Sequence, residues 1–129
     1  MPEKVHCMNT TKIKPMSINQ AYQGRKYKTP KYKAWREQVS FMLPPQIDLP
    51  KGRKALCITF GVSSKLFDTD NGIKPFVDAL QDKYGFNDRE IYLLCSGKVD
   101  VPKGSEFIKW ELTSLAAYDD FMKVLSEIE

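Results

Sequence analysis

A pattern of apolar residues in the middle of the chain limits its possible folds more than any other feature. Between Asn71 and Tyr84, apolar side chains recur at spacings of three and four residues, which is the period of an amphipathic α-helix. Asp70 stands at the expected N-cap, and Gly85 supplies the left-handed residue that often ends a helix. Such a helix has to bury its apolar stripe against another layer, so the pattern predicts a packed domain around it. The stripe consists of Ile73, Phe76, Val77, Leu80 and Tyr84.

A second helix is predicted over residues 30–43. Thr29 is a suitable N-cap, Pro30 favours the first helical position, and Pro44-Pro45 stops the helix. Its expected core face consists of Tyr32, Trp35, Val39 and Met42. The C-terminal residues 115–128 are predicted to form a third helix, because their apolar positions also share one face.

Strands are predicted on both sides of the central helix. Residues 53–62 are rich in β-branched and apolar side chains, and residues 90–99 and 106–113 alternate in the same way. The turn sequence Pro102-Lys103-Gly104 between the last two predicts a hairpin. A short alternating run at residues 5–9 predicts one more strand, and the polar residues 10–28 predict a long loop.

These elements predict an α/β (α+β) fold, a single domain over residues 1–129 with a small mixed sheet flanked by helices. The 129 residues are 42% hydrophobic and 28% charged, which is an ordinary globular balance. No apolar stretch approaches the roughly 18 residues that a membrane span needs, and the N-terminus does not resemble a signal peptide. We therefore expect a cytoplasmic protein with no membrane association. Cys7, Cys57 and Cys95 have no metal-binding spacing and are expected to be reduced and buried.

Charge is distributed unevenly along the chain. Residues 1–54 contain 12 Lys and Arg against 3 acidic residues, whereas residues 55–129 contain 8 against 13. The basic half has the character of a polyanion-binding surface, since such a surface gains free energy by releasing the counterions of nucleic acid. A solvated basic face is the alternative that charge alone leaves open.

Acidic residues are the side chains best suited to any chemistry here, because the single His6 excludes a zinc site that needs two histidines. Asp68 and Asp70 precede the central helix, and in an extended segment two such carboxylates point the same way and can share Mg²⁺. Lys74 lies about 40° around the helix from Asp70, where it can face a phosphate. In the structural alternative, Asp70 caps the helix, Asp68 complements its dipole, and Lys74 forms an ion pair with Asp70 or Asp78.

The acidic residues and their neighbours form a longer pattern. Asp68-Thr69-Asp70-Asn71 is followed by Lys74, Asp78-Ala79-Leu80, Gly85 and Asp88, and this string resembles the motif of the RusA family of Holliday-junction resolvases. Asn19, Tyr22 and the basic residues 25–33 also look like the N-terminal half of that family. The resemblance covers residues 15–100, and the acidic cluster is its specific part.

The resemblance implies a homodimeric, Mg²⁺-dependent endodeoxyribonuclease, with Mn²⁺ able to substitute, that resolves four-way (Holliday) DNA junctions in recombination and repair. It implies Asp68, Asp70 and Asp88 as metal ligands and Lys74 as a phosphate-facing base. We interpret Asp78 as a solvated or ion-pairing residue, because it lies well off the apolar stripe. Residues 68–88 are thus the predicted metal site.

The chain departs from the family pattern at three positions. Asn87 stands where members often have a second acid beside the last aspartate, Gly72 replaces a usually larger residue, and Pro75 falls early in the predicted helix. These differences bear on metal affinity more than on the fold.

Residues 10–43 are the predicted DNA-binding region. Residues 25–36 contain six positive charges and three aromatic residues with no acid, which suits contact with DNA phosphates. Tyr27 is free to stack on an unpaired base, whereas the spacing of Tyr32 and Trp35 favours the core. The predicted DNA-binding side chains are those of Asn19, Arg25, Lys26, Lys28, Lys31, Lys33 and Lys74.

Two other functions fit the sequence. One is a non-catalytic, basic DNA-binding module whose aspartates only cap a helix. The other is a metal-dependent phosphoryl-transfer enzyme that uses the same carboxylates on RNA or nucleotides.

The reach of the chain leads to a further expectation about assembly. A helix of 15 residues rises about 22 Å, and four residues can return at most about 14 Å, which leaves Asp88 short of Asp70. Two antiparallel copies would instead set Asp68 and Asp70 of one chain beside Asp88 of the other, twice over. We therefore expect a homodimer with composite metal sites.

Overall fold

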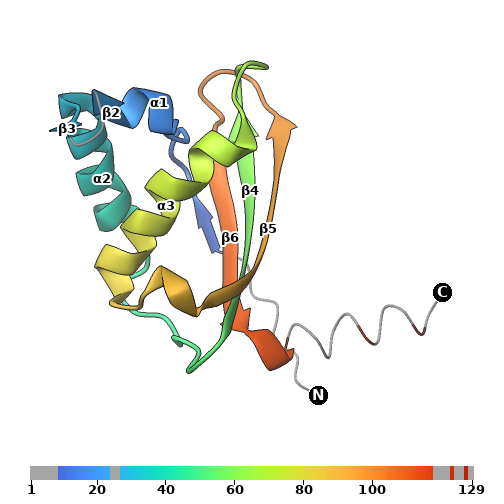
Figure 1. Cartoon of the computed structure of the whole chain (residues 1–129). Coiled ribbons are helices and arrows are strands. Elements are labelled where there is room, and N and C mark those ends of the chain that lie inside the picture. The colour runs from blue at the N-terminus through green and yellow to red at the C-terminus, as the bar shows by residue number, and fades with distance from the viewer. Residues whose placement is uncertain (1–8, 24–26, 118–122, 124–126, 128–129) are drawn as a thin grey trace.

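Four strands form one mixed sheet in the computed structural model, which describes residues 9–23, 27–117, 123 and 127. In spatial order the strands are β1 (Asn9–Thr11), β6 (Phe107–Ser114), β4 (Lys54–Val62) and β5 (Ile91–Asp100). The two main helices, α2 (Pro30–Met42) and α3 (Thr69–Tyr84), lie on one side of this sheet (Figure 1). The chain is a single α+β domain, as the sequence predicts.

The predicted hairpin is wrong, because β4 lies between the two strands that were expected to pair. β4 runs parallel to β5, with Leu56 opposite Leu94, and antiparallel to β6, with Ile58 opposite Trp110. A parallel pair needs a crossover, and α3 provides it. The turn at residues 101–106 therefore carries the chain past β4, which is the most apolar strand and takes the central position.

The core fills the space between the sheet and the helices. The residues of β4 that face the helices alternate with Cys57 and Thr59, which face the opposite side and are half-buried. Tyr84 packs beside Trp110, and its hydroxyl donates a hydrogen bond to the Pro44 carbonyl oxygen at 2.7 Å. The fully buried large apolar side chains are Trp110, Tyr32, Phe60, Phe76, Leu43, Leu56, Ile58, Leu80, Ile108 and Val39.

The central helix is confirmed, but it begins at Thr69, two residues before the predicted start. Asp68, not Asp70, occupies the N-cap, and Gly85 ends the helix with φ 76° as predicted. Gly72 is buried where a Cβ atom would meet the Phe67 ring at 2.5 Å and the Phe60 ring at 3.1 Å. A residue without a side chain lets this end of α3 approach the sheet closely, which accounts for the glycine.

The predicted second helix is also confirmed. Thr29 caps α2 by accepting a hydrogen bond from the Tyr32 amide at 3.2 Å, and Pro30 is its first residue. Met42 is wrongly assigned to the core face: it is 37% exposed, and Leu43, the C-cap, is buried instead. The helix ends at Met42, so the chain changes direction and Leu43 turns inward.

The predicted loop over residues 10–28 is wrong in part. It contains most of β1, the short helix α1 (Ile18–Ala21), and the two-residue strands β2 (Tyr22–Gln23) and β3 (Tyr27–Lys28). Tertiary partners stabilise these short pieces, since β1 pairs with β6 and β2 pairs with β3. The predicted strand at residues 5–9 lies mainly outside the described residues, as does most of the predicted C-terminal helix, of which residues 115–117 are helical.

Two of the three cysteines lie opposite each other. Cys57 of β4 and Cys95 of β5 are reduced, as predicted, but both are half-buried rather than buried. They face the side of the sheet that α2 and α3 do not cover. Burial raises the pKa of the Cys57 thiol to about 11, with a further contribution from Cys95. Cys7 lies outside the described residues.

Within the described part of the chain, no helix combines the length and the apolar character needed to cross a bilayer.

Candidate functional site

The acidic residues of the motif lie at opposite ends of α3. Asp68 and Asp70 are at its start, beside the carboxyl end of β4, and Asp88 follows its end, just before β5 begins. The 16 residues of α3 rise about 24 Å along the helix axis. The topology therefore sets the two parts of the motif far apart along one chain.

At the start of α3 both carboxylates are exposed. Asp68 has an extended backbone, with φ −95° and ψ 130°, and its carbonyl oxygen accepts a hydrogen bond from the Asn71 amide at 3.0 Å. Its side chain makes no capping hydrogen bond. Asp70 lies in the first turn, where the helix dipole favours a negative charge. The capping role considered for Asp70 is therefore wrong, and the Asp68 carboxylate at the N-cap makes no hydrogen bond to the helix, although its charge lies where the helix dipole favours it.

The pairing geometry expected for these two carboxylates also needs correction. Asp68 is extended but Asp70 is helical, so the argument that both side chains point the same way along a strand does not apply. The loop before them is tied to β5, because the Lys98 ammonium donates hydrogen bonds to the carbonyl oxygens of Phe67 at 2.5 Å and Lys65 at 3.4 Å. Lys98 thus fixes the position from which α3 starts.

Asp88 is presented by a short 3-10 helix, η1 (Asp88–Glu90). Asn87 is its N-cap: the side chain accepts a hydrogen bond from the Arg89 amide at 2.9 Å, and the Asn87 amide donates to Glu90 Oε2 at 3.4 Å. These reciprocal bonds form a capping box. They hold both neighbours of Asp88 while its own carboxylate remains exposed.

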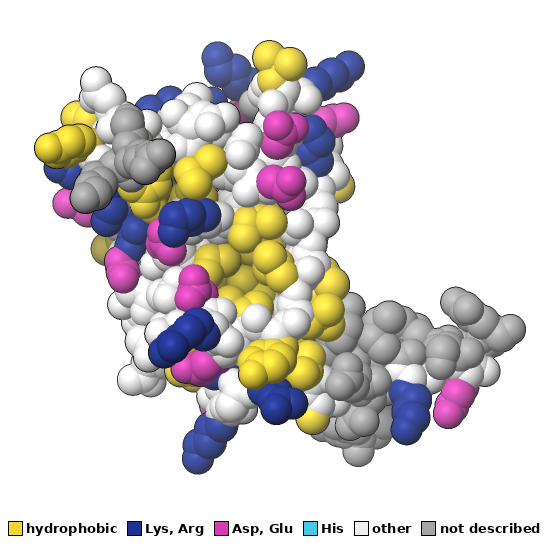
Figure 2. Space-filling view, viewed as in Figure 1, with side chains coloured by type: hydrophobic (Ala, Val, Ile, Leu, Met, Phe, Trp, Pro, Cys, Tyr) yellow, Lys and Arg dark blue, Asp and Glu magenta, His cyan; other side chains and the backbone are white. Residues whose placement is uncertain are grey.

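Between α3 and β5 there is a shallow hollow of about 330 Å³. Figure 2 shows hydrophobic side chains gathered in the middle of this face, with acidic groups above and below them. Lys74, Asp78 and Asp88 stand among the apolar residues of the hollow, and Lys74 Nζ lies 3.3 Å from Asp78 Oδ2. The apolar lining comes from Ile73, Val77, Ile91 and Leu94.

The structure therefore brings Asp88 together with Lys74 and leaves Asp68 and Asp70 outside the hollow. The interpretation of Asp78 as an ion-pairing residue is confirmed. Carboxylate oxygens are the ligands that Mg²⁺ prefers, so the donor type is suitable. Among the described residues, however, no group of three or more acidic, histidine or cysteine side chains is placed to hold one metal ion. Asp68, Asp70 and Asp88 of one chain therefore do not form a complete three-carboxylate site.

The predicted DNA-binding residues lie mostly on the surface. Asn19, Lys28, Lys31 and Lys33 are exposed, whereas Arg25 and Lys26 lie outside the described residues. Lys28 belongs to β3 and shares a small hollow with residues of α2 and α3, so this residue of the basic segment lies beside α3.

The aromatic residues of this segment divide as predicted. Tyr32 and Trp35 are buried, their rings stack with centroids 6.1 Å apart, and Trp35 Nε1 donates a hydrogen bond to the Lys14 carbonyl oxygen at 2.7 Å. Burial raises the pKa of Tyr32, although Arg36 beside it acts in the opposite direction. Tyr27 is 77% exposed, which leaves its ring accessible to a base.

Sequence reasoning missed the role of Asn87 and the residues around η1. It treated Asn87 only as a missing acid, although Asn87-Asp88-Arg89-Glu90 has the spacing of a capping box and indicates a helical turn. Arg53 and Tyr92 gave no signal, because only the fold brings them beside Asn87 and Arg89.

Comparison with protein-family models found no match for this chain, and a search of curated proteins found no significant match.

Proposed function

We propose that this protein is a metal-dependent endodeoxyribonuclease with a RusA-like fold that cuts four-way DNA junctions. The proposal rests on a contrast between the acidic residues around α3: some form ion pairs with Lys or Arg, and others do not. Asp78, Asp82 and Glu90 form ion pairs with Lys74, Arg36 and Lys54, respectively. The three acids of the motif, in contrast, form no ion pair with any described residue. They are Asp68, Asp70 and Asp88.

The three carboxylates are apart within one chain, and bringing them together between two chains is costly unless a cation binds between them. Like charges repel, and a divalent cation with oxygen ligands relieves that repulsion. Asp68, Asp70 and Asp88 would hold Mg²⁺ or Mn²⁺. Such an ion supplies Lewis-acid stabilisation of a phosphoryl group and activates water for its hydrolysis.

Lys74 is suited to contact the phosphate that is cut. Its side chain is 56% exposed, and its ion pair with Asp78 lies at the surface, where such pairs contribute only about 0–1 kcal/mol. A DNA phosphate can therefore replace Asp78 as the partner of Lys74 at little cost. Before DNA binds, the ion pair with Asp78 keeps the Lys74 ammonium at the surface of α3, where the phosphate would bind.

Two copies of the chain complete the site in this proposal. A twofold axis through the hollow between α3 and β5 would bury the apolar residues there and set two α3 helices antiparallel. Asp68 and Asp70 of each chain would then meet Asp88 of the partner subunit. Two such sites match the two incisions that resolution of a four-way junction requires.

The basic segment supports DNA as the substrate. Lys28 is exposed beside α3, and Lys31 and Lys33 are exposed on α2, so a strand bound to Lys28 would have its phosphates next to the helix that begins at the acidic site. Exposed Tyr27 offers a ring for a base that is unpaired at the branch point.

A cleavage assay tests the proposal directly. A synthetic four-way junction, a linear duplex of the same sequence and single-stranded RNA would be incubated with the protein and with Mg²⁺, Mn²⁺ or EDTA. We expect paired cuts in the junction with either metal and none with EDTA. Asp70→Asn should bind the junction without cutting it, while Asp48→Asn, the same change at an exposed acid distant in sequence, should cut normally.

Other outcomes would decide between the rival functions. Junction binding without cleavage under every metal condition would indicate a DNA-binding module. Preferential cleavage of RNA would indicate a phosphoryl-transfer enzyme with a different substrate. Unchanged cutting by Asp70→Asn would remove this residue from the site.

A further inference from the structure

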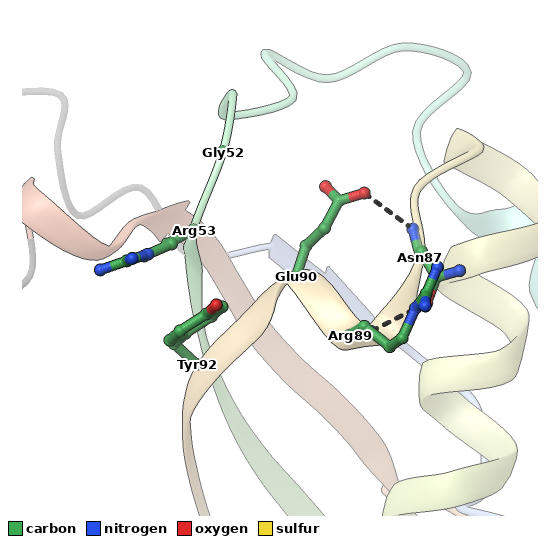
Figure 3. A pocket seen from close by; sticks show the side chains of 6 residues that line it. All are labelled: Gly52, Arg53, Asn87, Arg89, Glu90 and Tyr92. Carbon is green, nitrogen blue, oxygen red and sulfur yellow. Dashed lines mark hydrogen bonds between the residues drawn. The ribbon is translucent and has the colours of Figure 1, made fainter.

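A second surface with the character of a nucleic-acid contact lies on the other side of η1. Residues at the start of β4, on η1 and at the start of β5 enclose an open hollow of about 390 Å³. Figure 3 shows Arg53 and Tyr92 on one side of it, Arg89 on the other, and Glu90 between them. It is distinct from the hollow that contains Asp88, although Asp88 and Arg89 are consecutive residues.

The cations of this hollow are available to a ligand. Within the described part of the chain, neither Arg53 nor Arg89 forms an ion pair, and both are exposed. The Arg53 guanidinium lies over the Tyr92 ring, 4.9 Å from its centroid. This cation–π contact orients the guanidinium without neutralising it. Tyr92 is itself 60% exposed.

The one acid that lines the hollow is already engaged. Glu90 forms an ion pair with Lys54, which is buried and also donates a hydrogen bond to the Gly52 carbonyl oxygen at 2.9 Å. The Lys54 ammonium lies against this carboxylate, so the negative charge of Glu90 already has a cationic partner within the protein. Lys54 thus links β4 to its preceding loop and to η1 at the base of the hollow. Its positive charge also offsets the negative charge of Glu90 there.

We infer that this hollow binds the phosphates of the DNA strand next to the cleavage point, with Arg53 and Arg89 as the contacts and Tyr92 as the residue that positions Arg53. The inference rests on the proposed function. Asp88 and Arg89 are consecutive residues, so a strand whose scissile phosphate lies at Asp88 would run next to this hollow, where Arg89 and Arg53 would contact its following phosphates.

The chemistry favours a nucleic-acid strand over a small anion. The two arginines stand on opposite sides of an open hollow, so they suit successive phosphates of a chain rather than one compact group (Figure 3). Guanidinium groups form bidentate hydrogen bonds to phosphate oxygens, which holds the strand in register.

The salt dependence of DNA binding tests this inference without cleavage. Binding of the intact protein to a four-way junction would be measured in EDTA over a series of salt concentrations. The double variant Arg53→Gln/Arg89→Gln should bind more weakly and lower the slope of log affinity against log salt by about two, since each phosphate contact contributes about one. Lys12→Gln/Lys109→Gln, with the same charge change beside β1 and on β6, should leave the slope unchanged. An unchanged slope in the arginine variant overturns the inference.

Phosphate ethylation locates the contact. Ethyl groups on the phosphates one or two nucleotides from the cut should weaken binding of the wild-type protein but not of the arginine variant. Tyr92→Phe keeps an aromatic ring under Arg53 and should show the same ethylation interference as the wild-type protein. Tyr92→Leu removes the ring and should show weaker interference. If the interference maps elsewhere, the inference is wrong even though the protein cuts junctions. If the wild-type protein binds no DNA, the proposed function falls as well.

Discussion

The two flanks of α3 differ in how completely the chain covers them. On the flank toward α2, Arg36 donates a hydrogen bond to the Asp78 carbonyl oxygen at 3.4 Å and forms an ion pair with Asp82. Lys83 donates to the Ser40 carbonyl oxygen at 2.7 Å, and burial raises the pKa of Tyr84, which hydrogen-bonds residue 44, to about 12. We call this the closed flank, because side chains and backbone of α2 and its following loop satisfy it.

On the flank toward β5, apolar residues remain partly accessible. Ile73 and Ile91 are half-buried, and Leu94 is 42% exposed. We call this the open flank. β5 is also an edge strand of the sheet, as β1 is on the other side, so one long side of its backbone has no partner strand among the described residues. An apolar hollow beside an unpaired edge is the part of the fold best suited to a second chain.

This difference explains why the acids on α3 and just after it are of two kinds, those with a cationic partner and those without one among the described residues. Asp82, on the closed flank, has a cationic partner and contributes to the fold. Asp70 and Asp88 have no described partner, and they frame the open flank. Function is expected where the fold leaves charge and apolar surface unsatisfied.

The largest effect should come from removing the unpaired acids. Asp70→Asn and Asp88→Asn each remove a proposed metal ligand worth several kcal/mol of transition-state stabilisation, so cleavage should fall by at least about 100-fold. Binding should be retained or tighter, because a negative charge near DNA is lost. Cleavage and gel-shift assays on the same preparations measure both effects.

Mixing these two inactive variants tests whether the open flank is shared between chains. A heterodimer would contain one doubly altered site and one intact site, so cutting of one strand should return. Mass spectrometry would confirm that subunits exchange. If heterodimers form and no strand is cut, each site belongs to a single chain.

Core truncation should distinguish the covered stripe of α3 from the open flank. Leu80 is fully buried, so Leu80→Ala should lower the free energy of unfolding by about 2–5 kcal/mol. Leu94→Ala should cost less than about 1 kcal/mol, since the side chain is already partly in water. Urea denaturation at low protein concentration measures both, and equal losses would contradict the distinction.

A charge on the open flank should disrupt assembly. Leu94→Asp should weaken self-association by about tenfold or more, because an unpaired carboxylate would be buried in the interface. Phe41→Asp is the matched control, since Phe41 is 89% exposed on α2. Sedimentation velocity measures the oligomeric state, and a dimer that tolerates Leu94→Asp would place the interface elsewhere.

The smallest effect is expected from the basic residues beside the closed flank. Lys28→Gln/Lys31→Gln/Lys33→Gln should weaken junction and duplex binding together and flatten the salt slope by about one per contact. Preference for the junction should change less than affinity, because phosphate contacts read no sequence or branch. A slope that stays at the wild-type value would indicate a solvated face.

Much of the fold could be predicted because its signals are local. The caps of α2 and the glycine that ends α3 are set by neighbouring residues, and both helices lie close to their predicted bounds. Pairing between strands is not local. The turn at residues 102–104 indicated only that the chain turns, and competition for the centre of the sheet placed β4 between β5 and β6.

By itself, the sequence determined which residues are candidates for chemistry: the string from Asp68 to Asp88, with Lys74 within it. It also determined the amphipathic helix between them, since helical periodicity depends only on spacing. Only the tertiary structure decided which acids are neutralised, because Arg36 and Lys54 are distant in sequence from Asp82 and Glu90. Tertiary structure likewise left the β5 flank open and placed Arg53 and Arg89 on opposite sides of one hollow, because long-range packing determines which residues share a surface.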